Sequence, residues 1–336
     1  MNDAAARAAR VRRGVGWFER PDRGVIQVTG SDRVRWANGM LTNDIAALAP
    51  DAARSGCYAL LLTPKGRIAA DLHVSFHDEA LWLEVARDAL TEVMQRLDGF
   101  LIADDVTLTD ISDSHRHFAL EGPRAREVLE RAAGSTLEIA LDCYVRTTLS
   151  GVDVLVTAWG LSGETAYQLM VAPSSAGRVR EAIFAAAGED LVEGDAATLE
   201  VLRVESGTPR LGAELGLDVL PGETNLMERA VSMSKGCYTG QEIVARMASR
   251  GAASHRMVGI AFGDADAVAS GALVAGAPVS VDGTNVGEVT SVCHSDLAGP
   301  IALGFVRRVH AEIGVAVGVG ELGGRVAALP FVAKST

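Results

Sequence analysis

The sequence predicts an α+β protein that ends in a small antiparallel β-domain. Two successive β-rich segments, each with helical stretches, occupy residues 17–115 and 116–250. Strands covered by helices in this arrangement are typical of α+β folds. Residues 251–332 contain short β-prone runs separated by Gly and Asp turns, which fits a barrel or sandwich of roughly 80 residues. Within it, Asp282-Gly283 lies between two alternating apolar runs and predicts a hairpin.

The first segment alternates strands with two helices. Strands are expected at residues 25–30, 56–63, 68–76, 81–86 and 101–109, and helices at 33–40, after a cap at Ser31 or Asp32, and at 88–99, ended by Gly99. Along 68–76, apolar and other residues alternate, so one face of this strand belongs to a core. The opposite face carries Asp71 and His73 side by side, toward water or a cavity.

The second segment repeats this pattern. A helix is expected to begin at Pro123, because the first helical position does not need a backbone N–H. Strands at 152–159 and 165–173 and a helix at 174–188 follow, and a further helix starts near Asp195.

The composition excludes several classes of protein. Lys and Arg number 31 against 43 Asp and Glu, for a net charge of −12, which argues against a nucleic-acid or anionic-membrane surface. No apolar run approaches the roughly 20 residues needed to cross a bilayer, and no secretory signal is evident, so a cytoplasmic protein is expected. The four cysteines lack the spacing of a metal site, and no metal is expected.

The segment 234–250 holds the sharpest chemical feature. Thr239 and Glu242 have the spacing of a capping box, so a helix should begin at about Gly240. Cys237 lies two residues before that cap, close to Lys235. The positive end of the helix and the lysine would favour the thiolate form of the cysteine. The alternative is an ordinary capped turn with a buried cysteine.

The string Lys235-Gly236-Cys237-Tyr238-Thr239-Gly240-Gln241-Glu242 resembles the K-G-C-Y-x-G-Q-E signature of the YgfZ family, whose relatives are the GcvT-like folate-binding proteins. Further stretches similar to GcvT-like motifs are Leu41-Thr42-Asn43-Asp44, Glu121-Gly122-Pro123, Ser162-Gly163-Glu164 and Leu202–Gly207. The resemblance implies GcvT-like folate-binding domains followed by a C-terminal antiparallel β-barrel, with three domains around a central hole that binds folate.

The resemblance also implies roles for individual residues. Glu164 matches the glutamate that binds the pterin ring in glycine-cleavage aminomethyltransferases, and Arg203 matches an arginine that contacts folate there. Asp71 matches an aspartate near the reacting folate nitrogen, although these enzymes usually carry paired aspartates and this chain has Ala70-Asp71. Without the resemblance, Glu164 reads as a solvated loop acid, Arg203 as an i,i+3 partner of Glu200, and Asp71 as a solvent-facing strand residue.

The matched motifs place Asn43, Lys235 and Tyr238 with Asp71, Glu164 and Arg203 among the residues expected to bind the cofactor, and they leave Cys237 and Asp71 as the catalytic candidates. The implied cofactor is tetrahydrofolate or a one-carbon derivative of it. The implied partners are iron–sulfur cluster enzymes or their assembly factors, met transiently.

Three functions follow from these matches. The first is a tetrahydrofolate-dependent accessory protein for the assembly or repair of iron–sulfur enzymes, acting through Cys237. The second is a folate-dependent aminomethyltransferase or demethylation module. The third is a binding module that senses folate without catalysis. The sequence does not decide whether the protein has one-carbon transferase-like activity.

Overall fold

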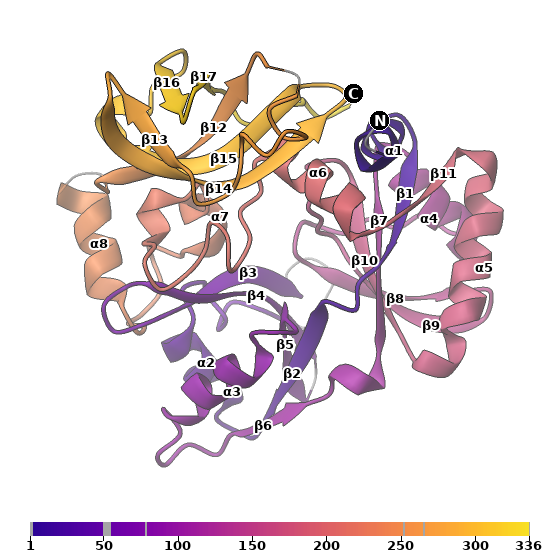
Figure 1. The fold of residues 1–336 in the computed structure, drawn as a ribbon. Helices are drawn as coiled ribbons and strands as arrows, with labels where there is room; N and C mark the ends of the chain where they lie inside the picture. The colour runs from indigo at the N-terminus through magenta and orange to yellow at the C-terminus, as the bar shows by residue number, and fades with distance from the viewer. Residues whose placement is uncertain (1–2, 50–54, 78, 251–252, 265, 336) are drawn as a thin grey trace.

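The computed structural model describes residues 3–49, 55–77, 79–250, 253–264 and 266–335. These residues form two sheets and a closed barrel, arranged as three lobes (Figure 1). None of the helices in the described ranges is long and apolar enough to cross a membrane. The chain termini approach each other, because the Ser335 hydroxyl donates to the backbone carbonyl of Arg12 at 2.9 Å.

The first sheet is built from the N-terminal part of the chain. Its strands lie in the order β3 (Gly56–Leu62), β4 (Ile68–His77), β5 (Ala80–Ala86), β2 (Arg23–Thr29) and β6 (Thr107–Asp110). Helices α2 (Arg33–Met40) and α3 (Leu90–Asp98) pack against it. The expected alternation along β4 is present, since Ala70, Leu72 and Val74 lie in the core of this sheet. Asp71 and His73 therefore lie on the face turned away from these helices.

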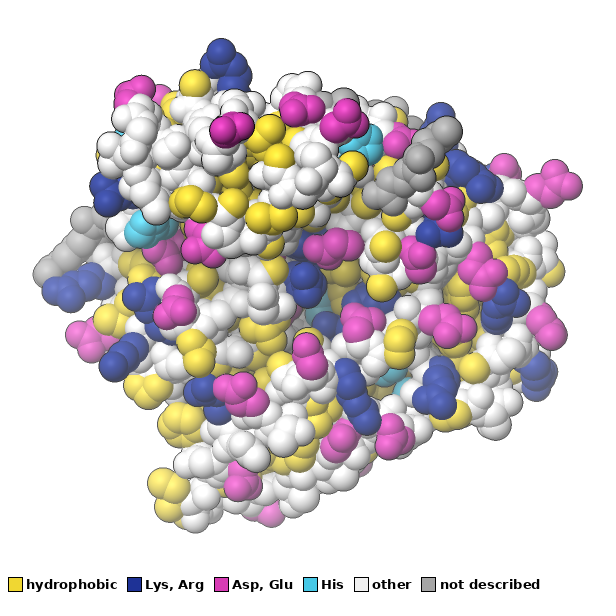
Figure 2. All heavy atoms as spheres, in the orientation of Figure 1, with side chains coloured by type: hydrophobic (Ala, Val, Ile, Leu, Met, Phe, Trp, Pro, Cys, Tyr) yellow, Lys and Arg dark blue, Asp and Glu magenta, His cyan; other side chains and the backbone are white. Residues whose placement is uncertain are grey.

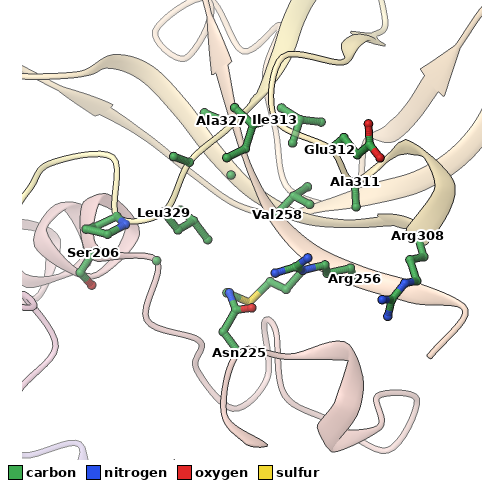
Figure 3. A pocket seen from close by; sticks show the side chains of 16 residues that line it. Ser206, Asn225, Arg256, Val258, Arg308, Ala311, Glu312, Ile313, Ala327 and Leu329 are labelled. Carbon is green, nitrogen blue, oxygen red and sulfur yellow. The ribbon is translucent and has the colours of Figure 1, made fainter. Parts of the chain in front are cut away.

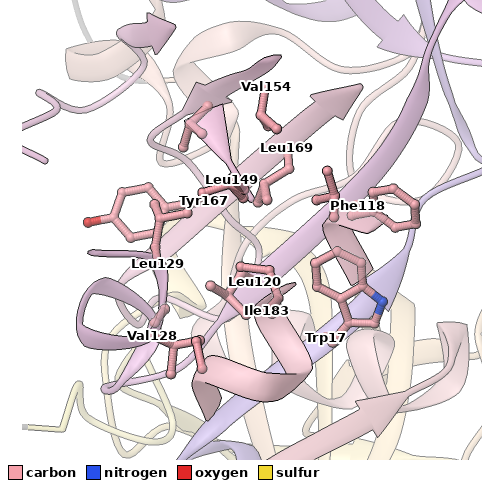
Figure 4. Packing of buried hydrophobic residues seen from close by; sticks show 14 of the residues in the cluster. Trp17, Phe118, Leu120, Val128, Leu129, Leu149, Val154, Tyr167, Leu169 and Ile183 are labelled. Carbon is pink, nitrogen blue, oxygen red and sulfur yellow. The ribbon is translucent and has the colours of Figure 1, made fainter. Parts of the chain in front are cut away.

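The second sheet combines the start of the chain with its middle part. Its strands lie in the order β11 (Leu191–Gly194), β1 (Val15–Glu19), β7 (Arg116–Glu121), β10 (Ala166–Val171), β9 (Val152–Thr157) and β8 (Tyr144–Leu149). Helices α4 (Ala125–Ala133) and α5 (Ala176–Ala187) cover one face, and Figure 4 shows the apolar side chains between the layers. Trp17 stacks on Phe118 with ring centroids 4.6 Å apart, which fastens β1 to the middle of the sheet.

The barrel closes the C-terminal part of the chain. Its strands lie in the order β12 (His255–Phe262), β15 (Gly299–Arg307), β14 (Thr284–Ser295), β13 (Pro278–Val281), β16 (Ala316–Val319) and β17 (Leu322–Ala327). The predicted hairpin at Asp282-Gly283 joins β13 to β14, and both residues have positive φ, 49° and 75°, as a tight hairpin turn requires. The antiparallel C-terminal barrel is thus confirmed.

Four further α-helices occur in the described part of the chain. Helix α1 (Asp3–Val11) and helix α6 (Ala196–Ser206) pack together against β14 and β15. Helices α7 (Met227–Ala230) and α8 (Gln241–Arg250) flank the predicted cysteine segment. This segment packs on the first sheet through Tyr238 and Val244, which share a core with Tyr58, Leu60 and Ile68.

Most expected elements are present, with three differences, of which the first is that the helix expected to begin at Pro123 is α4, which begins at Ala125. The strand expected at 101–109 is only β6, from Thr107 to Asp110. Ser31 and Asp32 do not cap α2, because the side chains of both residues bond to Asp105. The division into domains at 17–115, 116–250 and 251–332 stays a prediction. Strand β1 does not follow it, because this N-terminal strand pairs with β7 and β11 of the second sheet.

Candidate functional site

The cysteine segment is fastened to the loop that follows α2. Lys235 donates to the backbone carbonyls of Asn38, Leu41 and Asn43 at 2.5, 2.7 and 2.8 Å. An ammonium group has three donors, so these bonds use all of them. Two of the matched sequence motifs, 41–44 and 235–242, are therefore joined in space by one side chain.

Lys235 occupies a partly dehydrated position. Its Nζ atom lies 5.1 Å from the centre of the Tyr238 ring, within the range of a cation–π contact. Burial lowers the pKa of Lys235 to about 8, against the opposing effect of Asp44. The lysine thus serves the packing of the loop, and its donors are directed at carbonyl oxygens.

Cys237 is exposed, as a reactive thiol needs to be. Helix α8 begins at Gln241, one residue after the predicted start. Gly240 has a φ of +80°, and a Cβ atom there would lie 2.7 Å from the carbonyl oxygen of Thr63. A side chain is therefore excluded at Gly240, because the turn between β3 and β4 lies directly against the start of α8. The alternative of a buried cysteine is wrong.

Asn43 connects this loop to the interior of the molecule. Its side-chain amide donates to the backbone carbonyls of Tyr58 and Arg229, at 2.8 and 3.0 Å. Thr42 adds a bond from its hydroxyl to the carbonyl of Ala230. Asn43 thus fixes the backbone of the two residues whose side chains lie next to Asp71.

Asp71 is half-buried and held by a tyrosine. The phenol of Tyr58 donates to Oδ2 of Asp71 at 3.0 Å. Burial and the neighbouring Asp71 carboxylate raise the pKa of Tyr58, so its phenol stays a donor. The other oxygen of Asp71 bonds to no residue within the described part of the chain. Arg229 covers the Tyr58 ring at 4.5 Å from its centre.

A partly buried ion pair joins this group to α7 and to the loop before β8. Arg229 binds Asp142 through two bonds of 3.0 and 2.6 Å, and His73 Nδ1 lies 3.2 Å from the same carboxylate. Burial disfavours the ionised Asp142, but His73 and Arg229 outweigh it and hold the Asp142 pKa at about 2. Gly56 permits the approach, because a Cβ there would overlap the carbonyl oxygen of Asp142.

Trp159 joins this group through His73, whose ring also contacts Tyr58 with centroids 4.8 Å apart. The Trp159 ring stacks on His73 with centroids 3.8 Å apart, and Arg23 lies 5.2 Å from its centre. Arg23 itself is paired with the buried Glu84 at 2.9 Å. The Trp159 indole N–H is buried, and no described residue accepts a hydrogen bond from it. A recess near the centre of one face, with basic and histidine atoms inside it, is visible in Figure 2.

We call six neighbouring residues the central group: Tyr58, Asp71, His73, Asp142, Trp159 and Arg229. Its rings already contact one another and the neighbouring arginines, because His73 lies against both Tyr58 and Trp159 and Arg229 covers Tyr58. Asp71 offers a free carboxylate oxygen as an acceptor for N–H groups. The amino-pyrimidinone edge of a pterin requires such an acceptor, so Asp71 fits a folate.

Glu164 does not lie in the central group. Its side chain is fully buried, pairs with Arg12 at 3.0 Å and accepts from the Ser335 backbone N–H at 3.1 Å. Arg12 also binds Glu205 at 2.9 Å. In this structure the Glu164 carboxylate joins α1 to the C-terminal segment. The expected contact with a pterin therefore stays a prediction. The alternative of a solvated acid is wrong, because the Glu164 side chain is buried.

Arg203 is likewise committed to protein partners. Its fully buried guanidinium binds Glu200, Glu214, the carbonyl of Thr208 and the hydroxyl of Ser291, through five hydrogen bonds. A guanidinium has five N–H donors, so none remains for a ligand. The i,i+3 pair with Glu200 is confirmed. The expected contact of Arg203 with folate stays a prediction, because all its donors here bond to protein groups.

The sequence did not single out four members of the central group: Tyr58, Asp142, Trp159 and Arg229. Asp142 and Arg229 are 87 positions apart, and no local pattern relates them. The sequence did indicate His73, because the alternation along β4 places it on the same face as Asp71. No group of three or more metal-ligating side chains occurs among the residues that the structure describes.

A cavity of about 680 Å³ lies elsewhere, between the barrel and the end of α6 (Figure 3). Arg256, Arg308 and Asn225 lie on its polar side, and Val258 and Leu329 on its apolar side. None of the central group lines it, so it is separate from the candidate site.

Comparison with known proteins gives a consistent relationship over the whole chain. The family model of the GCVT N-terminal domain matches residues 1–235, and that of the glycine cleavage T-protein C-terminal barrel domain matches residues 255–334. An aminomethyltransferase of Streptomyces avermitilis is 32% identical, covering 96% of this chain and 87% of its own length. An aminomethyltransferase of Cutibacterium acnes is also 32% identical, with 97% and 89% covered.

A solved structure agrees with the fold. The crystal structure of glycine cleavage system aminomethyltransferase T from Bartonella henselae superposes with a TM-score of 0.85. It is 21% identical, and the match covers 98% of this chain and 89% of that one. The arrangement of two sheets and a barrel is therefore shared with that enzyme.

Proposed function

The chain belongs to the glycine cleavage T-protein family, and on that premise we propose that it binds tetrahydrofolate, or a one-carbon derivative, at the central group. The proposal rests on the half-buried Asp71 carboxylate, which Tyr58 holds at 3.0 Å through one oxygen and whose other oxygen bonds to no residue in the described part of the chain. The aminomethyltransferases that match this chain support a folate ligand.

Each residue of the central group has a task in this proposal. Asp71 accepts an N–H bond from the pterin or stabilises a developing cation, and Tyr58 orients its carboxylate. Arg229 and Asp142 fix Tyr58 and His73 in place through their ion pair. Tetrahydrofolate, when bound, supplies a nitrogen that accepts or releases a one-carbon unit. Glu164 and Arg203 contribute by holding the lobes together rather than by touching the ligand.

The second part of the proposal concerns Cys237. We infer that this exposed thiol makes the protein a cytoplasmic accessory factor for the assembly or repair of iron–sulfur enzymes, as in the YgfZ-like group. Support comes from the complete signature around Cys237 and from the bonds of Lys235 and Asn43, which link that loop to Tyr58 and Arg229. Asn43, Lys235 and Tyr238 thus act by positioning the loop beside the central group.

An aminomethyltransferase or a demethylation module is the second candidate. The relatives named aminomethyltransferase favour it, because the match covers 87% and 89% of their lengths. Formation of methylene-tetrahydrofolate from a lipoyl-bound aminomethyl group, assayed on the purified protein, separates this candidate from the accessory role. A pure folate sensor would bind the cofactor and need neither Cys237 nor turnover.

Calorimetric titration of the purified protein with tetrahydrofolate tests the folate part directly. Saturable binding that weakens in Asp71→Asn supports the proposal. Absence of binding contradicts all three candidates, since each of them requires a bound folate.

A further inference from the structure

The cavity of Figure 3 lies at the end of the barrel where β12 begins, and the function proposed above makes no use of it. Its volume of about 680 Å³ falls within the range of roughly 300–1,000 Å³ that is typical of small-molecule sites. The start of β12 lines one part of it, and the segment that follows β15, from Arg308 to Ile313, lines another. The end of α6 and Asn225 lie on the side of the sheets.

Part of the cavity wall is apolar. Val258 and Ala311 line it, and both also belong to the apolar core of the barrel or pack against that core. Ile313 lines it as well, although 72% of this residue is exposed to solvent. An apolar group placed against these side chains would remove the exposed area of Ile313 from water, which is favourable.

Two arginines lie on the polar side of the same cavity. Arg256 precedes Val258 by two residues on β12, so both side chains project from one face of that strand. Figure 3 shows Arg256 and Arg308 on the same side of the cavity, and the lining carboxylate of Glu312 on the side away from Arg256.

These two arginines have no counter-ion in the protein. Neither the Arg256 nor the Arg308 guanidinium forms an ion pair or a side-chain hydrogen bond with any residue that the structure describes. Two guanidinium groups at one cavity favour an anion, and the planar fork of donors suits a carboxylate, which it can bind through two parallel hydrogen bonds. The apolar wall in turn favours a ligand that also carries a hydrocarbon body.

We propose that this cavity binds a small amphipathic carboxylate. Arg256 and Arg308 hold the head group, and the apolar body lies against the wall that Val258, Ala311 and Ile313 form. None of the central group lines the cavity, so this site and the proposed folate site should fill independently. Failure of folate binding would leave this proposal standing, and the reverse also holds.

Octanoate and its neutral analogue octanamide test the two parts of the site separately, because they share the apolar chain and differ in the charge of the head group. Each is titrated into the whole protein, with the heat followed by calorimetry and the backbone amide signals of residues 256–258 and 308–313 followed by NMR. We expect saturable binding of octanoate that shifts these signals. Octanamide should bind about tenfold more weakly or worse, because it lacks the charge-assisted hydrogen bonds.

Variants assign the head group and the body to their contacts. Arg256→Gln should weaken octanoate binding about tenfold and leave octanamide unchanged, whereas Ile313→Ser should weaken both ligands. Arg10→Gln is the matched control, because Arg10 is an exposed arginine of α1 that does not line the cavity.

Saturating tetrahydrofolate should leave the affinity for octanoate unchanged. The proposal is overturned if octanoate does not bind saturably, if octanamide binds as tightly, if Arg10→Gln has the same effect as Arg256→Gln, or if tetrahydrofolate displaces octanoate.

Discussion

The ammonium group of Lys235 lies 2.7 Å from the backbone carbonyl of Leu41, although the two residues are 194 positions apart in the sequence. Together with its bonds to Asn38 and Asn43, this contact closes the cysteine segment onto the loop after α2. The exposed thiol is therefore presented on a fixed loop, next to the residues that hold Tyr58 and Arg229.

Replacement of Lys235 by methionine should loosen this loop. Three hydrogen bonds from a charged donor are lost, and three carbonyls must find water instead. Because the position is only partly buried, we expect a loss of roughly 2 kcal/mol in the free energy of unfolding, measured by urea titration. Lys65→Met, in the exposed turn between β3 and β4, is the control and should change little. Equal stability of the two variants would show that the bonds of Lys235 do not hold the loop.

Removal of the Glu164 carboxylate should affect stability rather than folate affinity. Glu164→Ala leaves the buried Arg12 with Glu205 as its only carboxylate partner in the described chain, and breaking a buried pair costs roughly 3 kcal/mol. The exposed pair of Asp3 and Arg7 provides the control, since Asp3→Ala should cost less than about 1 kcal/mol.

The same Glu164→Ala protein discriminates between two roles for this residue. If folded Glu164→Ala binds tetrahydrofolate as tightly as the wild type, the glutamate acts as a structural link between α1 and the C-terminal segment. A loss of affinity of about tenfold or more in the folded variant would instead restore the pterin contact that the resemblance implies.

The sequence predicts local features well and distant contacts poorly. The hairpin at Asp282-Gly283, the alternation along β4 and the start of α8 near Gly240 depend on neighbours in the chain, and all three are present within a residue. The central group depends on Asp142 meeting Arg229 and on Trp159 meeting His73. The members of each pair are far apart in the chain and meet only in the folded molecule, so no local sequence pattern predicts these contacts.

The motif matches identify corresponding residues, but they do not by themselves establish what each residue contacts. Asp71 keeps one carboxylate oxygen without a partner in the described chain, and its role toward a ligand stays a prediction. Glu164 and Arg203 belong to equally good motif matches, yet their charges are satisfied by Arg12 and by Glu200 and Glu214. Whether a matched residue faces a ligand depends on partners such as Arg12, which the motif itself does not include.

Acid should destabilise the protein through its buried histidines. Burial holds the pKa values of His77 and His117 at about 4, against 6.5 for a free side chain. Below pH 6.5 the unfolded chain binds more protons than the native protein, so the free energy of unfolding falls as the pH drops toward 4. Each histidine contributes at most roughly 3 kcal/mol to this loss.

Urea titrations between pH 7 and pH 4 measure this dependence. His117→Gln should make the pH dependence of the free energy of unfolding less steep, by the contribution of one histidine. An unaltered slope in His117→Gln would show that the native ring takes up its proton without cost.

Cys237→Ala separates the accessory role from simple binding. The side chain is exposed, so the free energy of unfolding should change by less than about 0.5 kcal/mol, and folate affinity should persist. In cells that lack the native protein, the variant should fail to restore the activity of iron–sulfur enzymes. Met233→Ala, an exposed residue of the same loop, is the control and should restore it. Full restoration by Cys237→Ala contradicts a role for the thiol.

The proposed folate site depends on the Asp71 carboxylate that Tyr58 holds. Isothermal titration of the wild type, Asp71→Asn and the exposed control Asp88→Asn with tetrahydrofolate tests this role. We expect saturable binding by the wild type and Asp88→Asn, and affinity weakened about tenfold in Asp71→Asn. Equal affinities in all three proteins, or no binding in any, would contradict it.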